Sequence, residues 1–142
     1  MSFLPQPLPL VRQPEPFSDR DWIFEIKYDG FRALACLDSS GVRLISRNAN
    51  RFSTFDPLCQ SIAFFLSVKN AVIDGEIACL DENGCSHFNH LLFRRGEPTF
   101  CAFDLLSLNG RDLRDRPLIE RKCWLRDILP ECPQLAGFLK SA

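Results

Sequence analysis

The sequence predicts one small α+β domain in which antiparallel sheets are flanked by helices. Two observations lead to this prediction. Short segments with alternating apolar and polar residues are separated by turn residues, which is typical of antiparallel strands. Two longer segments repeat apolar residues three and four positions apart, which is typical of amphipathic helices. The 142 residues, 46% of them hydrophobic, are enough for one core.

The first strand is expected over residues 22–28, where apolar and polar side chains alternate. The residues assigned to the core face are Trp22, Phe24, Ile26 and Tyr28. Those assigned to the opposite face are Ile23, Glu25, Lys27 and Asp29. Gly30 permits a tight reversal and a close backbone approach, and residues 31–37 are expected to return as the second strand. Lys27 would then lie near the tip of a hairpin.

Three more strands are expected along the chain. Residues 42–46 would complete an antiparallel meander with the first two strands, and residues 71–80 and 99–107 carry the same apolar character. Turns are expected at residues 39–41, 81–84 and 108–110.

Two helices are expected beside this sheet. The first covers residues 54–68, with Thr54 as a cap and Pro57 in the first turn. The second begins near Pro117 and ends before Pro130. The residues assigned to its inner side are Leu118, Ile119, Lys122 and Leu125.

The ends of the chain differ from its middle. Residues 1–18 are a proline-rich lead that cannot be helical, residues 19–130 are the expected domain, and residues 131–142 are a short tail. The start lacks the features of a signal peptide, and no apolar run approaches the ~20 residues of a membrane span. We expect a soluble, cytoplasmic protein with no membrane contact.

Composition excludes several classes of function. The net charge of -1 leaves no global attraction for nucleic acid, so any such binding needs a local patch. No glycine-rich phosphate loop is present. The seven cysteines are scattered, which predicts reduced, mostly buried thiols. Residues Cys85, His87 and His90 have a spacing that a metal could use, with a polar loop bearing two exposed imidazoles as the alternative.

Four positions suggest chemistry, and each has a plainer alternative. Lys27 lies among carboxylates and could be a nucleophile, or it is an ordinary solvated lysine. Asp74-Gly75-Glu76 could hold a metal ion, a ribose hydroxyl or an ammonium, or form a bulge with two solvated acids. Arg47 could bind phosphate or lie on the surface, and Phe103 could stack on a purine or belong to the core.

These segments occur in an order that resembles the adenylation domain of ATP-dependent DNA ligases. The segments that carry the resemblance are residues 27–30 with Arg32, then 46–48, 74–76 and 100–106. Residues 110–122 are similar to the bacterial repair members of the family. Lysine-x-aspartate-glycine alone also fits RNA ligases and capping enzymes, but residues 100–122 favour DNA ligase. The resemblance covers roughly residues 20–125 and implies a nucleotidyltransferase, ATP-grasp-like fold.

The resemblance implies that Lys27 attacks the α-phosphate of ATP to give a phosphoramidate and pyrophosphate. The implied nucleotide contacts are Glu25 to the adenine amino group, Phe103 to the adenine face, Arg32 and Arg47 to the ribose and phosphates, and Glu76 to the ribose or a metal. The implied metal is Mg²⁺ or Mn²⁺. Nearby positive charge or desolvation would help the amine lose its proton.

The chain departs from the family after its last helix. Family members continue into strands with Glu-Gly and further lysines and then into an oligonucleotide-binding domain, whereas this sequence stops at Ala142. The resemblance therefore implies a partial domain, truncated before the last motifs, that a second chain could complete.

Three hypotheses about function follow from these observations. The first is a self-adenylating ligase that joins nicked or broken DNA in repair or recombination. The others are a noncatalytic ATP-binding or DNA-repair interaction module and a degenerate domain. The arginines that could touch DNA in the first two, or form a solvated surface, are Arg94, Arg95, Arg111, Arg114 and Arg116.

Overall fold

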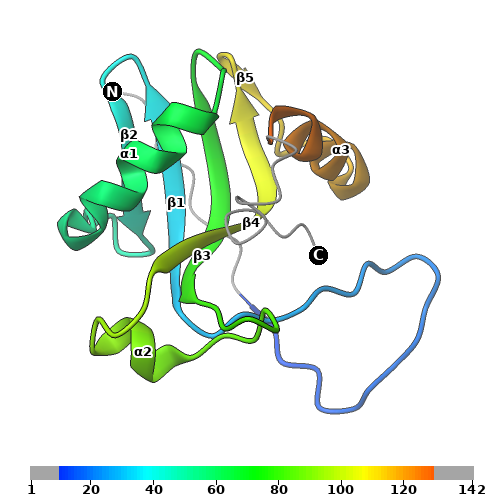
Figure 1. The fold of residues 1–142 in the computed structure, drawn as a ribbon. Helices are drawn as coiled ribbons and strands as arrows, with labels where there is room; N and C mark the ends of the chain where they lie inside the picture. The colour runs from blue at the N-terminus through cyan, green and yellow to red at the C-terminus, as the bar shows by residue number, and fades with distance from the viewer. Residues whose placement is uncertain (1–9, 130–142) are drawn as a thin grey trace.

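The computed structural model describes residues 10–129, which form a curled antiparallel sheet with flanking helices (Figure 1). The sheet has five strands in the order β2-β1-β3-β4-β5. The strands are β1 (Phe31–Asp38), β2 (Gly41–Ser46), β3 (Ala71–Cys79), β4 (Pro98–Leu108) and β5 (Arg111–Asp112). The helices are α1 (Asp56–Phe65), α2 (Phe88–Leu92) and α3 (Leu118–Ile128), with a 3-10 turn η1 (Ser53–Phe55) before α1. The predicted α+β class is confirmed.

The main core lies between one face of the sheet and the helices. Helix α1 covers β1 and β2, and α3 lies beside β4 (Figure 1). The largest fully buried side chains of this core are Leu44, Ile62, Ile73, Ile77, Phe100, Leu105 and Leu125. Burial of each such side chain stabilises the fold by roughly 1.5–3 kcal/mol. The strands and α1 therefore form a well-packed core that can hold the side chains of a site on the sheet in place.

Both predicted helices are present, as α1 and α3, but the predicted cap of the first and one inner residue of the second are wrong. Pro57 lies in the first turn of α1 as predicted, but Phe55 occupies the cap position and no side chain caps the helix. The prediction of Thr54 as the cap is wrong because that residue lies in η1. In α3 Leu125 is buried as predicted, whereas Ile119 is 59% exposed. The short elements α2 and β5 are too brief to show a period.

The predicted strand over residues 22–28 is wrong. These residues form no strand, and Trp22, Phe24 and Ile26 are 62%, 58% and 68% exposed instead of buried, whereas Tyr28 is buried as predicted. Strand β1 pairs with β2 along one edge and with β3 along the other. No edge of β1 remains for a hairpin partner, so the hairpin and the meander are also wrong.

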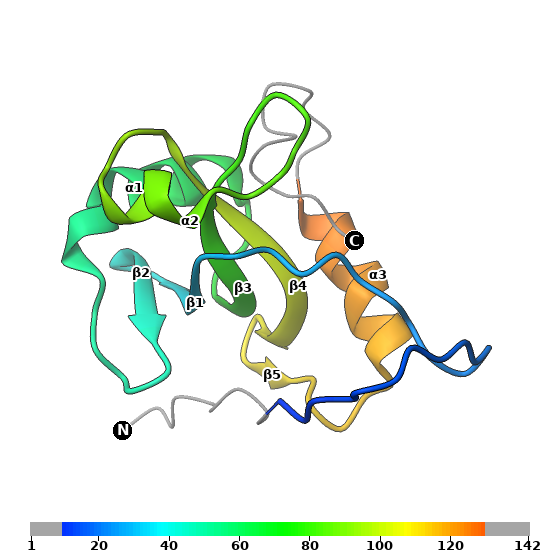
Figure 2. The same cartoon turned by 90° about the horizontal axis from the view of Figure 1, so that it is seen from below.

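The segment before β1 instead crosses the sheet in extended form. Figure 2 shows it passing the ends of β3 and β4 toward α3. Phe17 lies beside Trp22 and Phe24, with ring centroids 5.2 and 5.4 Å apart. Residues 10–18 of the predicted lead form no helix or strand, whereas residues 1–9 and the predicted tail, 131–142, lie outside the described residues.

Two further observations concern composition. Cys36, Cys59, Cys79 and Cys101 are buried, as predicted for most of the cysteines, and burial raises the pKa of the Cys36 thiol to about 11. Between residues 10 and 129, no helix is both long and apolar enough to cross a membrane.

Candidate active site

Gly30 brings the Lys27 segment against the sheet. A Cβ atom at Gly30 would lie 1.9 Å from the carbonyl oxygen of Ile77 in β3, so only glycine permits this approach. The predicted close backbone approach is confirmed, although it is made to β3 and not across a hairpin. Asp29 adds a second contact, because its backbone N–H donates to Ser86 Oγ at 2.8 Å. Lys27 itself is exposed to solvent.

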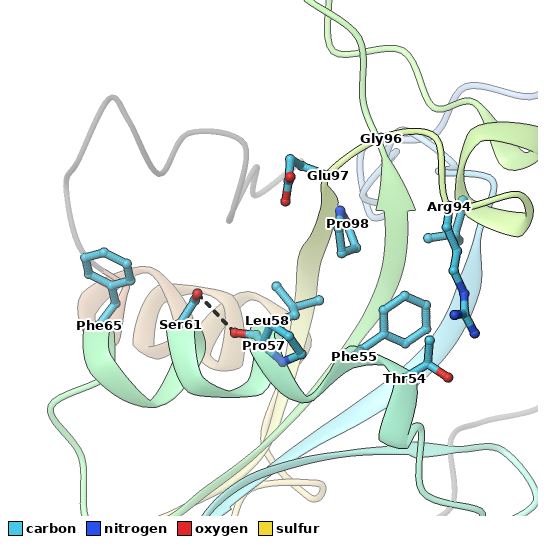
Figure 3. A pocket seen from close by; sticks show the side chains of 11 residues that line it. Thr54, Phe55, Pro57, Leu58, Ser61, Phe65, Arg94, Gly96, Glu97 and Pro98 are labelled. Atoms are coloured by element: carbon cyan, nitrogen blue, oxygen red, sulfur yellow. Dashed lines mark hydrogen bonds between the residues drawn. The ribbon is translucent and has the colours of Figure 1, made fainter.

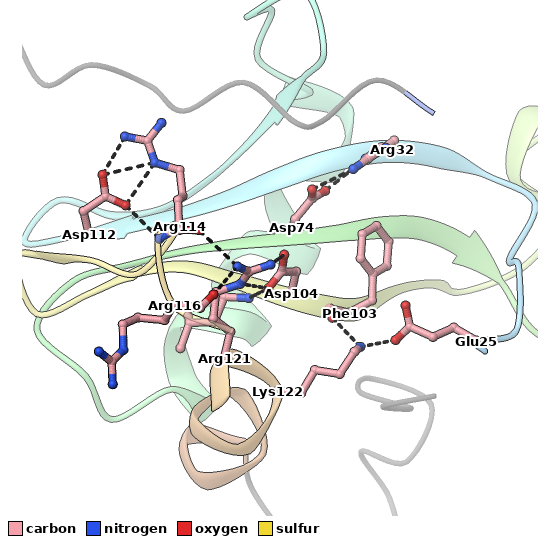
Figure 4. Close-up of polar contacts among 11 residues, drawn as sticks. Glu25, Arg32, Asp74, Phe103, Asp104, Asp112, Arg114, Arg116, Arg121 and Lys122 are labelled. Carbon is pink, nitrogen blue, oxygen red and sulfur yellow. Dashed lines mark hydrogen bonds and ion pairs between the residues drawn. The ribbon is translucent and has the colours of Figure 1, made fainter. Parts of the chain in front are cut away.

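Arg32 and Asp74 form a bidentate ion pair on the adjacent strands β1 and β3 (Figure 4). The guanidinium donates from Nε and Nη2 to the two carboxylate oxygens at 3.1 and 2.8 Å. Asp74 is 3% exposed, so the prediction of two solvated acids is wrong for this residue. The pairing of β3 with β4 shifts between Asp74 and Gly75, but the extra residue is Phe103 of β4, so the predicted bulge in β3 is wrong. The pair fixes the guanidinium on the sheet.

Glu76 lies between the sheet and the Lys27 segment. Its register partner in the neighbouring strand β1 is Arg32, and the Glu76 side chain is half-buried. Burial raises its pKa above the ordinary value, against the opposing effects of the Gly30 backbone N–H and the positive charges of Arg32 and Lys27. Asp29 raises the pKa further. Burial therefore outweighs the positive charges of Arg32 and Lys27, which both lower the pKa of this carboxyl.

Glu25 and Phe103 are connected by Lys122, a residue for which the sequence predicted no role in the site. Lys122 of α3 forms an ion pair with Glu25 and also donates to the carbonyl oxygen of Phe103 at 2.7 Å (Figure 4). The Phe103 ring also lies 5.5 Å from the Arg32 guanidinium. The sequence placed Lys122 on the inner side of its helix, and a lysine at an inward position was the signal of a buried polar partner.

Arg47 lies at the same end of the sheet as Gly30 and Arg32, because Ser46 of β2 pairs with Ala33 of β1. It is exposed in the loop after β2, where it lines a shallow depression of about 360 Å³. The other residues that line this depression are Gly30, Phe31, Arg32, Ser46, Asn48 and Phe52. Gly30, Arg32 and Arg47 therefore border one hollow, in which phosphate groups could be bound.

A second hollow, of about 440 Å³, lies beside α1 and away from the predicted site (Figure 3). It is bordered by α1 and by the connection from α2 to β4, with Phe55, Leu58, Arg94 and Glu97 among its lining residues. None of the residues predicted for nucleotide binding lines it.

The residues predicted as a possible metal cluster have other partners. His87 Nε2 lies 2.8 Å from the Asp81 carboxylate, and the His87 and His90 rings stack with centroids 5.1 Å apart. The hydrogen bond with His87 lowers the pKa of Asp81. Within residues 10–129, no three His, Cys, Asp or Glu side chains are grouped so as to hold a metal ion.

Several arginines of the predicted DNA surface lie around α3. Arg114 pairs with Asp112 (Figure 4), and Arg116 pairs with Glu120. Arg111 and Arg116 lie 5.8 and 6.0 Å from the Trp124 ring. Exposed pairs of this kind contribute little to stability, so an anionic partner could replace the carboxylates at small cost.

The curled antiparallel sheet with flanking helices, against which Gly30 packs the preceding segment, is consistent with a partial nucleotidyltransferase domain. Comparison with known proteins gives the family. Residues 13–141 match the family model described as "ATP dependent DNA ligase domain". The chain belongs to the ATP-dependent DNA ligase family, and the domain is its adenylation domain.

Individual relatives agree with this assignment. The "Multifunctional non-homologous end joining protein LigD" of Pseudomonas aeruginosa is 32% identical over 88% of this chain and 15% of its own length. The solved ligase domain of M. tuberculosis LigD has a TM-score of 0.65 and 33% identity, covering 72% of this chain and 35% of that one. A mycobacterial DNA ligase D solved with ATP and MES has a TM-score of 0.59 and 31% identity, with the same coverage. The chain thus spans about a third of these solved proteins.

Proposed function

We propose that this chain performs the first step of DNA strand joining, the transfer of AMP from ATP to Lys27. The observation that carries the proposal is the close approach of Gly30 to Ile77 of β3, beside Glu76 and its register partner Arg32. ATP is the nucleotide named for a mycobacterial relative. The family of this domain is that of ATP-dependent ligases.

In this step the Lys27 amine attacks the α-phosphorus of ATP. A P–N bond forms, the P–O bond to the β-phosphate breaks, and pyrophosphate leaves while the amine loses its proton. Arg32 and Arg47, which border one depression, would neutralise the phosphate charge. Arg32 is already oriented by Asp74, so it needs little rearrangement to bind an anion.

Glu76 fits the needs of a magnesium or manganese ion. Mg²⁺ binds through one or two protein carboxylates together with substrate phosphates, and Glu76 offers one half-buried carboxylate beside Lys27. A bound metal ion supplies charge neutralisation at the phosphates. The alternative role for Glu76 is to accept a hydrogen bond from the ribose.

The base would lie between Phe103 and Glu25. The Phe103 ring offers a face for stacking, and the Glu25 carboxylate can accept a hydrogen bond from the adenine amino group. Both residues lie at the crossing of the Lys27 segment with β4 and α3. The lysine and the base contacts thus come from neighbouring parts of one surface.

The later steps need partners. The names of the LigD relatives refer to non-homologous end joining, which supports nicked or broken DNA as the substrate of the whole reaction and a role in repair or recombination. We propose that a second chain can supply the motifs that the family has beyond this domain. We also propose that the chain acts in the cytoplasm. We further propose that the adenylation domain of this chain covers residues 19–130.

The test uses ATP labelled on its α-phosphate, with Mg²⁺, followed by denaturing electrophoresis. We expect label to remain on the chain, to be lost in Lys27→Ala, and to persist in the control Lys69→Ala, which removes another exposed lysine. A folded chain that binds ATP without becoming labelled would contradict the proposal. It would favour the noncatalytic ATP-binding or DNA-repair interaction module.

A further inference from the structure

Glu25 is fixed by one residue of a distant helix. The segment from Trp22 to Asp29 has no strand partner among the described residues, so the position of Glu25 depends on side-chain contacts. Its carboxylate pairs with Lys122, 97 residues later in the chain. The Lys122 side chain is 12% exposed and the Glu25 side chain 29% exposed, so water competes only partly for this ion pair.

Lys122 is itself anchored on the sheet. Its ammonium group donates to the carbonyl oxygen of Phe103 at 2.7 Å while it pairs with Glu25 Oε1. An ammonium group has three donors and can satisfy both acceptors at once. Helix α3, strand β4 and the Lys27 segment are therefore joined at one nitrogen atom (Figure 4).

We propose that Lys122 is a positioning residue that sets adenine specificity through Glu25, an inference that rests on the proposed function. Lys122 occupies Oε1 of Glu25 and leaves Oε2 as an acceptor, while the same ammonium group is bound to the backbone carbonyl of Phe103. An acceptor held there favours the amino group of adenine. Guanine carries a carbonyl oxygen at the same position and would meet a carboxylate oxygen, which is repulsive.

The pair also determines where Lys27 lies. Glu25 is two residues before Lys27, and the contacts of Asp29 and Gly30 fix the segment on the other side. Loss of the Lys122 contact would release one end of the nucleophile's segment. The effect should fall on nucleotide affinity and base choice more than on the chemical step, because no reacting atom touches Lys122.

The test compares Lys122→Met, Lys122→Arg, Glu25→Gln and the double variant that combines Lys122→Met with Glu25→Gln. The control is Arg126→Met, which removes an exposed cation from the same helix. Hydrogen exchange of residues 22–29 is measured without nucleotide. Labelling of the chain is then measured against ATP and GTP concentration.

We expect Lys122→Met to speed exchange over residues 22–29 and to raise the half-saturating ATP concentration about tenfold, with the final extent of labelling little changed. The ATP preference over GTP should fall, Lys122→Arg should restore most of it, and Arg126→Met should change nothing. The double variant should be no worse than Glu25→Gln alone, because Lys122 acts through Glu25.

Three results would overturn the inference. The first is unchanged exchange and unchanged ATP dependence in Lys122→Met. The second is additive losses in the double variant, which would mean that Lys122 acts independently of Glu25. The third is a change in exchange without any change in the ATP-to-GTP ratio, which would leave a purely structural contact. If the unaltered chain takes no label, the proposed function fails, and exchange still decides whether Lys122 holds the segment.

Discussion

Strand β1 and the segment over residues 22–28 are both rich in apolar residues and were both predicted as strands, but they have opposite structures. β1 is paired along both edges, and its inward residues Ala33 and Ala35 are 2% and 1% exposed. The earlier segment has no strand partner in the described part of the chain, and its apolar residues Trp22, Phe24 and Ile26 face solvent. The alternation over residues 22–28 therefore did not suffice to make a strand, whereas β1 is a strand because both of its edges are paired.

The candidate site combines both kinds of structure. Arg32, Asp74 and Glu76 come from strands inside the sheet, where backbone pairing fixes them. Lys27 comes from the segment, which is held at Gly30, at Asp29 and through Glu25. The side of the site proposed to bind phosphate is thus built into the fold, whereas the position of the proposed nucleophile depends on a few long-range contacts.

The largest expected effect is at the junction of the two regions. Gly30→Ala would place a Cβ atom 1.9 Å from the Ile77 carbonyl oxygen, so either the segment or β3 must shift. We expect the free energy of unfolding to fall by about 3 kcal/mol or more. Gly96→Ala is the control, because its nearest neighbour, Cys79 Sγ, lies at an ordinary 3.5 Å. Equal stability of the two variants in urea unfolding would contradict the described junction.

Within the sheet, the next effect concerns the Arg32–Asp74 pair. Asp74→Asn leaves a partly buried guanidinium without its charged partner, and we expect a loss of about 2–4 kcal/mol. Glu120→Gln, which breaks the exposed pair with Arg116, should cost no more than about 0.5 kcal/mol. Chemical denaturation measures both. Similar losses would show that the site side of the sheet is no more rigid than its surface.

The smallest expected effect is on the pH dependence of stability, and it tests whether Glu76 is buried between the sheet and the Lys27 segment. Its pKa is raised in the folded state, so folding favours the protonated carboxyl and wild-type stability falls as pH rises from the ordinary value through the raised one. Glu76→Gln should therefore be more stable than wild type at neutral pH, by under about 1 kcal/mol, and the difference should vanish below pH ~4. Thermal unfolding across this range measures it. A variant that is less stable at neutral pH would contradict the burial.

The sequence predicted the parts of the fold whose pattern and partner are both local. Strands β1 and β2 are joined by a short turn, and α1 shows a full amphipathic period. Their own residues therefore suffice to predict these elements. The hairpin before β1 failed because strand order is a property of the whole sheet. Lys122 was missed because its partner Glu25 lies 97 residues away, a separation over which no local period operates.

The roles of single residues follow the same division. Gly30 was predicted to allow close backbone approach, and its contact with Ile77 confirms this. Asp74 was predicted as a site carboxylate, but its bidentate bond to Arg32 shows that it orients the guanidinium. The roles of Glu25, Arg47, Glu76 and Phe103 in nucleotide binding remain predictions.

The central claim is that Lys27 is the residue that accepts AMP. The most direct measurement is peptide mass mapping of the chain after incubation with ATP and Mg²⁺, with Lys27→Ala treated in parallel. We predict one AMP group on the peptide that contains Lys27, bound by a phosphoramidate that acid releases, and no AMP on any peptide of the variant. AMP on another residue, or an unmodified chain that nevertheless binds ATP, would contradict the claim.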